Sequence, residues 1–160
     1  MASTSYLARV LYKEHSGDGF AGTYKLLVAA KSISAPVSAP NTVESTTFED
    51  DSQTFLMGIK TSDAKTYTGN LEKKYLQDIN KLEGKQVDII QLYGSDGLGG
   101  TAKYAYVGQV VATPNDVSGT DSVLEMTVTA VPNTKPTECT DTLKVVDAGD
   151  GTFTVTKVGE

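Results

Sequence analysis

Hydrophobic and polar residues alternate most regularly in residues 121–131, DSVLEMTVTAV. A period of two places successive side chains on opposite faces of a strand, so the alternation predicts a strand with one buried face. The core face holds Leu124, Met126, Val128 and Ala130, and the opposite face holds Val123, Glu125, Thr127 and Thr129. This is the most regular strand pattern in the chain.

Shorter runs rich in Thr, Val, Ile and Tyr, bounded by Gly, Pro or Asn, predict about nine further strands. The loop 94–100, GSDGLGG, and the turn 149–151, GDG, predict two hairpins. Gly108 inside a predicted strand indicates a bulge or a close backbone approach. The other predicted strands span residues 6–13, 23–31, 41–48, 53–57, 65–68, 85–93, 103–112, 142–146 and 152–158.

Residues 71–82, LEKKYLQDINKL, carry the single helical pattern. Leu71, Tyr75, Ile79 and Leu82 recur at spacings of four, four and three, which places them on one helical face. Asn70 is the expected N-cap, and the lysines on the opposite face indicate exposure to solvent. The helix is therefore predicted to cover one side of a sheet. The fold class that follows is mainly β, an antiparallel β-sandwich or open barrel with one flanking α-helix.

The chain has 160 residues, a net charge of −6 and a sequence pI of about 4.8. One domain spanning 1–160 is expected at this length, and the acidic balance disfavours tight binding to nucleic acid, which needs Lys and Arg. The charge is unevenly distributed, because residues 32–59 hold four acids without a base and residues 104–134 hold three acids without a base. No apolar run approaches the length of a membrane span.

The residues that usually carry catalysis are scarce. His15 is the only histidine and Cys139 the only cysteine. His15 lies with Ser16 and Asp18 in a Gly-rich loop, where neighbours in sequence do not form a triad. Cys139 has no neighbouring motif that would lower its pKa. The loop 94–100 lacks the Lys of a phosphate-binding loop, so neither an enzyme nor a cofactor nor a metal site is expected.

Residues 35–58 differ from the rest of the chain in composition. Pro36 and Pro40 precede an extended run, the acids Glu49, Asp50 and Asp51 follow it, and a second extended run ends at Gly58. Thr, Val and Phe favour strands, whereas Pro and Gly are disfavoured inside them. The pattern predicts a strand, an acidic turn and a second strand.

The same stretch is similar to the signature region of the major tail tube proteins of long-tailed bacteriophages. The order of elements after it also resembles that family: a short strand, one helix, a hairpin with an Asp-Gly turn, and a Thr/Val-rich strand. The resemblance covers roughly residues 35–131. Its matching residues are Pro40, Glu44, Thr46, Thr47, Asp50, Asp51, Phe55 and Gly58.

The resemblance implies a structural virion protein with the phage tail tube fold. Six copies would form a ring, rings would stack into a tube, and double-stranded DNA would pass through the lumen without specific binding. An acidic lumen repels phosphate, so DNA does not adhere. Other expected partners are the tape measure protein and the tail terminator and tip proteins. The expected lumen-facing residues are Glu44, Glu125, Thr127 and Thr129, and the expected inter-subunit residues are Pro36, Pro40, Glu49, Asp50 and Asp51.

Three segments are expected to reach outside the subunit body: an N-terminal arm 1–14, an inter-subunit loop 32–52 and a C-terminal hairpin arm 132–160. The expected location is the virion tail, after assembly in the cytoplasm of a host bacterium. Two alternatives remain open, a soluble β-sandwich that binds a glycan or peptide and a tube protein similar to those of type VI secretion. The first would need an aromatic cluster at the surface, such as Phe20 with Tyr24 or Tyr104 with Tyr106.

Overall fold

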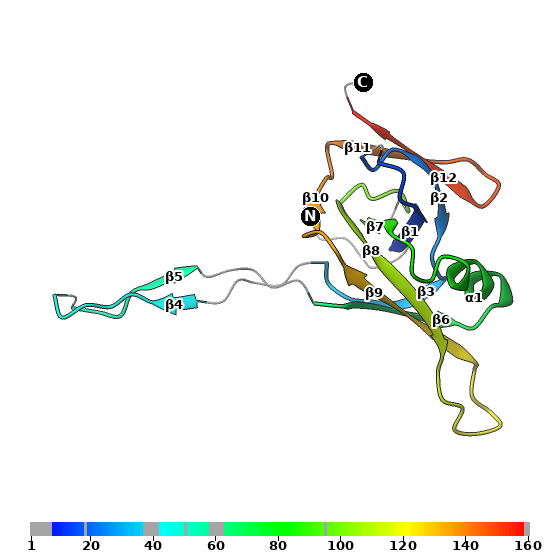
Figure 1. Ribbon diagram of the computed structural model, residues 1–160, viewed down its shortest axis with the longest axis horizontal. Coiled ribbons are helices and arrows are strands. Elements are labelled where there is room, and N and C mark those ends of the chain that lie inside the picture. The colour runs from blue at the N-terminus through cyan, green and yellow to red at the C-terminus, as the bar shows by residue number, and fades with distance from the viewer. Residues whose placement is uncertain are drawn as a thin grey trace.

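The computed structural model describes residues 8–17, 19–36, 42–49, 51–57, 63–94 and 96–158. Within these residues the chain forms one helix, α1 (Lys73–Asn80), and twelve strands (Figure 1). The strands are β1 (Arg9–Glu14), β2 (Gly22–Leu26), β3 (Ala30–Ile33), β4 (Thr42–Glu44), β5 (Phe55–Met57), β6 (Lys65–Asn70), β7 (Val87–Tyr93), β8 (Ala102–Pro114), β9 (Glu125–Pro132), β10 (Thr137–Glu138), β11 (Leu143–Asp147) and β12 (Thr152–Lys157).

Ten of these strands form one antiparallel sheet in the order β11-β12-β2-β1-β7-β8-β9-β6-β3, with β10 paired to β8. The sheet curls into a half-barrel (Figure 1), which confirms the expected mainly β fold with one flanking helix. Strands β4 and β5 pair only with each other and form a separate two-stranded sheet. The large sheet has β3 and β11 as its edges.

The central strands β1 and β7 are buried on both faces. Val10 and Ile89 contribute to one apolar cluster, together with Ile79 of α1. Leu11 and Ile90 point the other way, into a second cluster that contains side chains of β11 and β12. Burial on both faces explains why residues 87–93 show no alternation of apolar and polar residues. The single sheet therefore builds two cores.

Helix α1 covers one of these cores, as its apolar face predicts, but it is shorter than the expected 71–82. It begins after Glu72, whose extended backbone takes the N-cap position without a side-chain cap hydrogen bond. The prediction of Asn70 as the cap is wrong, because Asn70 is the last residue of β6 and pairs with Glu125. Beyond the helix the chain turns to Gly84, whose φ of 83° is the left-handed conformation that commonly ends helices.

Two glycines allow neighbouring backbones to approach closely. A β-carbon on Gly108 would lie 2.5 Å from the carbonyl oxygen of Val131 in β9, and one on Gly69 would overlap the carbonyl oxygen of Ala29. The pairing of β8 with β7 stays in register up to its last pair, Gly108 with Val87. Of the two predicted explanations for Gly108, close approach is therefore the one found, and no bulge is present on the β7 side.

A buried polar network crosses the interior of the half-barrel. The Tyr67 hydroxyl donates to Oε1 of Gln91 at 2.8 Å and also contacts the Tyr106 hydroxyl. Gln91 Nε2 donates to the carbonyl oxygen of Ser34 at 2.9 Å and to the Tyr93 hydroxyl at 2.7 Å. Desolvation by burial raises the pKa of Tyr67 and Tyr106, so both phenols stay protonated as donors. The network joins β6, β7 and β8 across the core.

The structure corrects several expected boundaries. Residues 23–31 form two strands rather than one, and residues 121–124 precede β9 in a loop, so Leu124 is 52% exposed instead of in the core. Of the expected N-terminal arm 1–14, residues 9–14 are the internal strand β1. Most of the expected C-terminal arm 132–160 also belongs to the body, because β12 pairs with β2 and its side chains enter the second core. Neither segment is a projecting arm over these residues.

Candidate assembly site

Strands β4 and β5 form a hairpin that stands apart from the half-barrel (Figure 1). Val43 pairs with Leu56 and Glu44 with Phe55. The ladder continues beyond the strands, because the Ser45 amide donates to the carbonyl oxygen of Thr54 at 2.8 Å and the Thr46 hydroxyl accepts from the Thr54 amide at 2.9 Å. The prediction of a strand, a turn and a second strand in this stretch is therefore confirmed, and we call its described residues, 42–49 and 51–57, the hairpin arm.

The hairpin arm exposes apolar side chains on both of its faces. Its register places Val43 and Leu56 on one face and Phe55 and Met57 on the other. A two-stranded hairpin is only marginally stable in water unless it packs on something else. These side chains thus form a surface suited to another protein surface. The exposed fractions are Val43 54%, Phe48 109%, Phe55 55%, Leu56 61% and Met57 79%.

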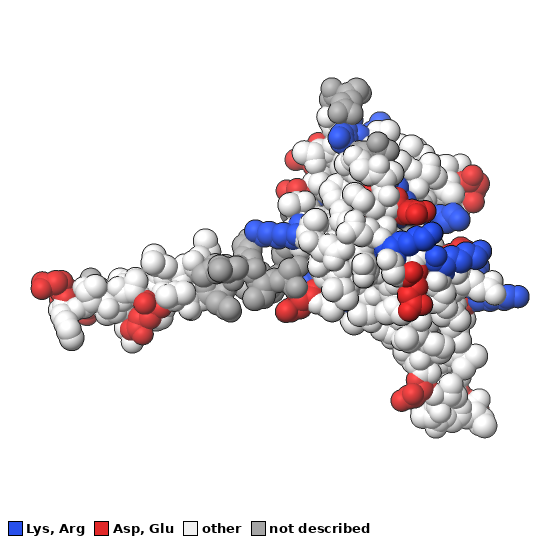
Figure 2. Space-filling view, viewed as in Figure 1, with Lys and Arg blue, Asp and Glu red and all other residues white. Residues whose placement is uncertain are grey.

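The acidic residues of the hairpin arm lie mainly at its tip. Glu49 and Asp51 are exposed near the turn, and Glu44 is exposed on β4. Figure 2 shows acidic atoms at the end of the arm farthest from the body. Of the other predicted inter-subunit residues, Asp50 and Pro40 lie outside the described residues. Pro36 is buried in the subunit, so its ring offers no contact surface.

A second candidate surface is the outward face of β6, β8 and β9, which we call the threonine face. Its residues lie opposite those of the first core: Thr129 pairs with Thr66, whereas the next residue, Ala130, points into the core. Glu125, Thr127 and Thr129 share this face, as the alternation predicts. The face consists of Thr66, Thr68 and Asn70 from β6, Gln109, Val111 and Thr113 from β8, and Glu125, Thr127, Thr129 and Val131 from β9.

The threonine face carries little charge. Its single acid, Glu125, lies 3.8 Å through Oε2 from Nζ of Lys31 in β3, and both side chains are more than a third exposed. Such a pair contributes little to stability. Glu44 is on the hairpin arm and not on this face. The two acids expected in the lumen are therefore not brought together on one surface of the subunit.

The structure also reveals a charged cluster that the sequence pattern did not indicate. Asp88 of β7 is fully buried, and its Oδ1 lies 2.7 Å from Nδ1 of His15. Lys13 Nζ lies 3.0 Å from the other carboxylate oxygen and donates to the Ser16 hydroxyl at 2.7 Å. His15 is thus a partner of a buried carboxylate and not simply a loop residue in solvent. A lone acid in an apolar run was the available signal, because buried charges require partners.

Two further predicted elements have structural explanations. Asp96 in the loop 94–100 accepts hydrogen bonds from the Leu98 and Gly100 amides, both at 3.1 Å, and these bonds lower its pKa. The loop joins β7 to β8, as expected of a hairpin loop.

Burial raises the pKa of the Cys139 thiol to about 11, so it is protonated at neutral pH. Among the described residues, no group of three or more His, Cys, Asp and Glu side chains is placed to hold a metal ion.

The fold and these surfaces define a mainly β half-barrel with an exposed arm. No family model matches the chain, and a search of curated proteins finds no matching sequence. In the part of the chain that the structure describes, no helix combines the length and apolar character needed to span a membrane.

Proposed function

We propose that this protein is the tube-forming subunit of a long-tailed phage tail, assembling as six-membered rings that stack around a DNA channel. The main support for the proposal is the hairpin arm. Its apolar side chains are exposed, because the arm stands apart from the body (Figure 1). Burying one such side chain contributes about 1.5–3 kcal/mol, so contact with another copy would stabilise the arm and the assembly together. The sequence resemblance over residues 35–131 supports the same reading.

The threonine face is the proposed wall of the channel. Hydroxyl and amide side chains form no ion pairs with DNA phosphate, and the neighbouring base Lys31 is paired with Glu125, so duplex DNA can slide past them. The edge strand β3 adjoins this face and has one unpaired side. Edge strands tend to pair with other chains, so β3 is the natural place for a neighbouring subunit to continue the wall.

The binding-module alternative has weaker support. It relied on surface pairs of aromatic residues, but Tyr24 and Tyr106 are both fully buried in the two cores. Their partners Phe20 and Tyr104 are partly buried. Tail partners such as the tape measure protein, and a location in the virion tail, remain part of the tube proposal.

The proposal predicts that the purified protein forms rings or tubes. Each contact between subunits should bury more than the roughly 1,000 Å² expected of a specific interface. Light scattering should show growth of large particles with concentration, and negative-stain electron microscopy should show six-fold rings or hollow tubes. Monomers at every concentration, with no conversion to rings or tubes, would refute the proposal.

A second prediction concerns the channel wall. Tubes built from the Glu125→Lys, Thr129→Lys variant should bind short duplex DNA, because each copy places two new ammonium groups along the lumen, whereas wild-type tubes should bind none. The affinity should fall as salt rises, since binding releases counterions from the duplex. Fluorescence anisotropy of a labelled duplex measures this.

The matched control, Asp147→Lys with Thr154→Lys, makes the same two changes in charge at exposed sites of β11 and β12, at the other end of the sheet. If tubes of the Glu125→Lys, Thr129→Lys variant bind no more duplex than the control tubes at low salt, the threonine face does not line the channel. Glu44→Lys, on the hairpin arm, tests the other predicted lumen acid in the same assay.

A further inference from the structure

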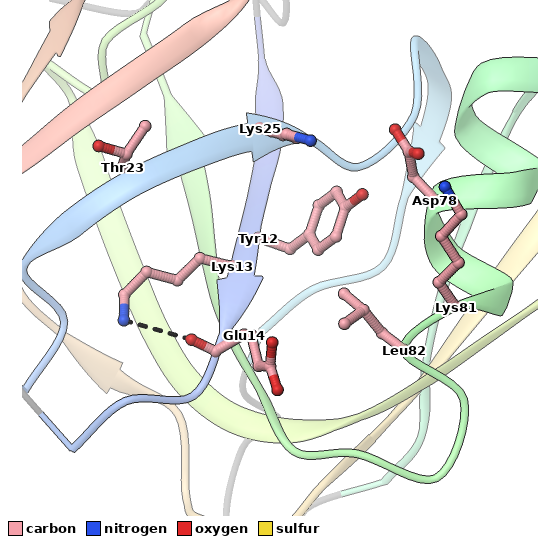
Figure 3. Close-up of a pocket in the computed structure, with 8 residues that line it drawn as sticks. All are labelled: Tyr12, Lys13, Glu14, Thr23, Lys25, Asp78, Lys81 and Leu82. Atoms are coloured by element: carbon pink, nitrogen blue, oxygen red, sulfur yellow. Dashed lines mark hydrogen bonds between the residues drawn. The ribbon is translucent and has the colours of Figure 1, made fainter.

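A groove runs between helix α1 and strands β1, β2 and β12. It consists of two adjoining cavities of about 310 and 360 Å³, both lined by Lys25 and Asp78. Figure 3 shows the first cavity, where the Tyr12 ring lies between the strand and the helix. The floor of the groove is apolar and aromatic, with Tyr12, Leu82, Leu26, Tyr75 and Phe153.

Bases outnumber acids by five to three among the residues that line the groove, the acids being Glu14, Asp78 and Asp150. Lys25 from β2 and Lys81 from the turn after α1 extend toward Asp78 from opposite sides (Figure 3), and neither forms an ion pair with any described acid. Lys74 contributes a further charge and lies 4.8 Å from the centre of the Tyr75 ring. Lys13 also lines the first cavity, but its ammonium is held by Asp88 and Ser16. The groove thus offers two uncommitted ammonium groups above an apolar floor.

The tip of the hairpin arm has the complementary chemistry. Phe48 is fully exposed, and the exposed acids Glu49 and Asp51 follow it in the chain. The arm and helix α1 lie at opposite ends of the long axis in Figure 1, so in this arrangement the tip does not reach the groove of its own chain. Figure 2 shows the same polarity of charge, with acidic atoms at the end of the arm and basic atoms gathered on the helix side.

We propose that the groove along α1 receives the tip of the hairpin arm from a second copy of this chain. Phe48 fills the space over Tyr12 and Leu82, and the carboxylates of Glu49 and Asp51 pair with Lys25 and Lys81. A buried aromatic anchor with charged partners at its rim is the usual anatomy of an energetically important contact. The inference rests on the proposed self-assembly and names the surface that receives the arm.

The Tyr12 hydroxyl adds a specific donor to this site. Burial, together with the nearby Asp78 carboxylate, raises the pKa of Tyr12 to about 12. The phenol is therefore protonated at neutral pH and can donate a hydrogen bond to an incoming carboxylate. Asp78 carries the opposite charge to the two lysines, but among the described residues it forms an ion pair with neither of them.

Charge-swapped full-length variants test the pairing. The tip variant Glu49→Lys, Asp51→Lys and the groove variant Lys25→Glu, Lys81→Glu should each lower the association constant at least about tenfold, because like charges then face each other. A chain carrying all four substitutions should assemble again, since its basic tip meets the acidic groove of the next copy. The control Lys144→Glu, Lys157→Glu makes the same change in net charge as the groove variant, at exposed sites of β11 and β12, and should assemble like wild type.

The outcomes separate this inference from the proposed function. If the groove variant assembles like wild type, the groove is not the docking site. The same conclusion follows if both double variants are impaired and the four-fold variant does not recover assembly. Neither result contradicts tube formation by the wild-type protein. If wild-type protein never assembles, the proposed function itself fails. Salt-sensitive binding of a labelled DNA duplex to the groove of wild-type protein, competing with assembly, would instead make the groove a nucleic-acid site and overturn the inference.

Discussion

Replacement of Phe55 and Leu56 by serine is expected to abolish ring and tube formation while leaving the melting temperature of the subunit unchanged. Both side chains are more than half exposed on the hairpin arm, which shares no strand pairing with the large sheet. Their removal therefore costs the folded body nothing. In the assembly, each would lose about 1.5–3 kcal/mol of burial per copy, and that loss repeats at every copy around and along a tube. Light scattering and circular dichroism measure the two effects.

The matched control is Val146→Ser with Val158→Ser. These valines are 46% and 59% exposed, close to the values for the arm residues, but they lie in and just after the strands at the β11 end of the sheet. The control should assemble as wild type does. Normal tubes from the Phe55→Ser, Leu56→Ser chain would show that the arm is not an assembly element. A lowered melting temperature for the same chain would show that the arm packs on its own body.

Gln91→Leu is expected to lower the free energy of unfolding by about 2–4 kcal/mol, the largest stability effect of any single change considered. Gln91 is fully buried and accepts from Tyr67 while donating to the Ser34 carbonyl and to Tyr93. Leucine fills a similar volume but removes the amide partner of the Ser34 carbonyl and of the Tyr93 hydroxyl and leaves the Tyr67 hydroxyl with Tyr106 alone, and each unsatisfied buried group costs about 1–3 kcal/mol. Urea denaturation followed by circular dichroism measures the change.

Gln109→Leu makes the identical substitution in β8, at an exposed position of the threonine face. It should change the free energy of unfolding by no more than about 0.5 kcal/mol, the usual range for surface sites. Equal effects of the two substitutions would mean that the buried network contributes nothing specific. Tyr67→Phe, which removes one hydroxyl and keeps the ring, should fall between them.

The sequence could predict those elements whose environments differ on their two sides. Strand β9 has a core face and an outer face, so its alternation correctly placed Met126 and Val128 inside and Thr127 and Thr129 outside. Pro and Gly at the borders of the hairpin arm likewise marked a separate strand pair. In these segments, local patterning and tertiary environment agree, which is the condition under which a pattern identifies a structure.

The pattern of apolar and polar residues did not predict the side-chain partners of a strand that has a different environment on each face. Strand β7 has a core on each face, and periodicity alone cannot show that Asp88 faces Lys13 and His15 or that Gln91 faces Tyr67. Those partners lie far away in sequence and are brought together only by the strand order. The placement of Leu124 in the core was wrong for a different reason, because β9 begins at Glu125, four residues after the predicted start of the strand at 121.

The hairpin arm also affects how an assembly of this protein would begin. Two strands in water hold their shape weakly, so the free subunit carries an arm whose order becomes fully stabilised only on contact. When the first two copies meet, ordering their arms costs conformational entropy, and few contacts form to offset that cost. A copy that joins the end of an existing stack gains several contacts at once. Such an imbalance makes nucleation slow and elongation fast, so purified subunits would polymerise only after a lag, and a pre-formed end would remove that lag and set where polymerisation starts.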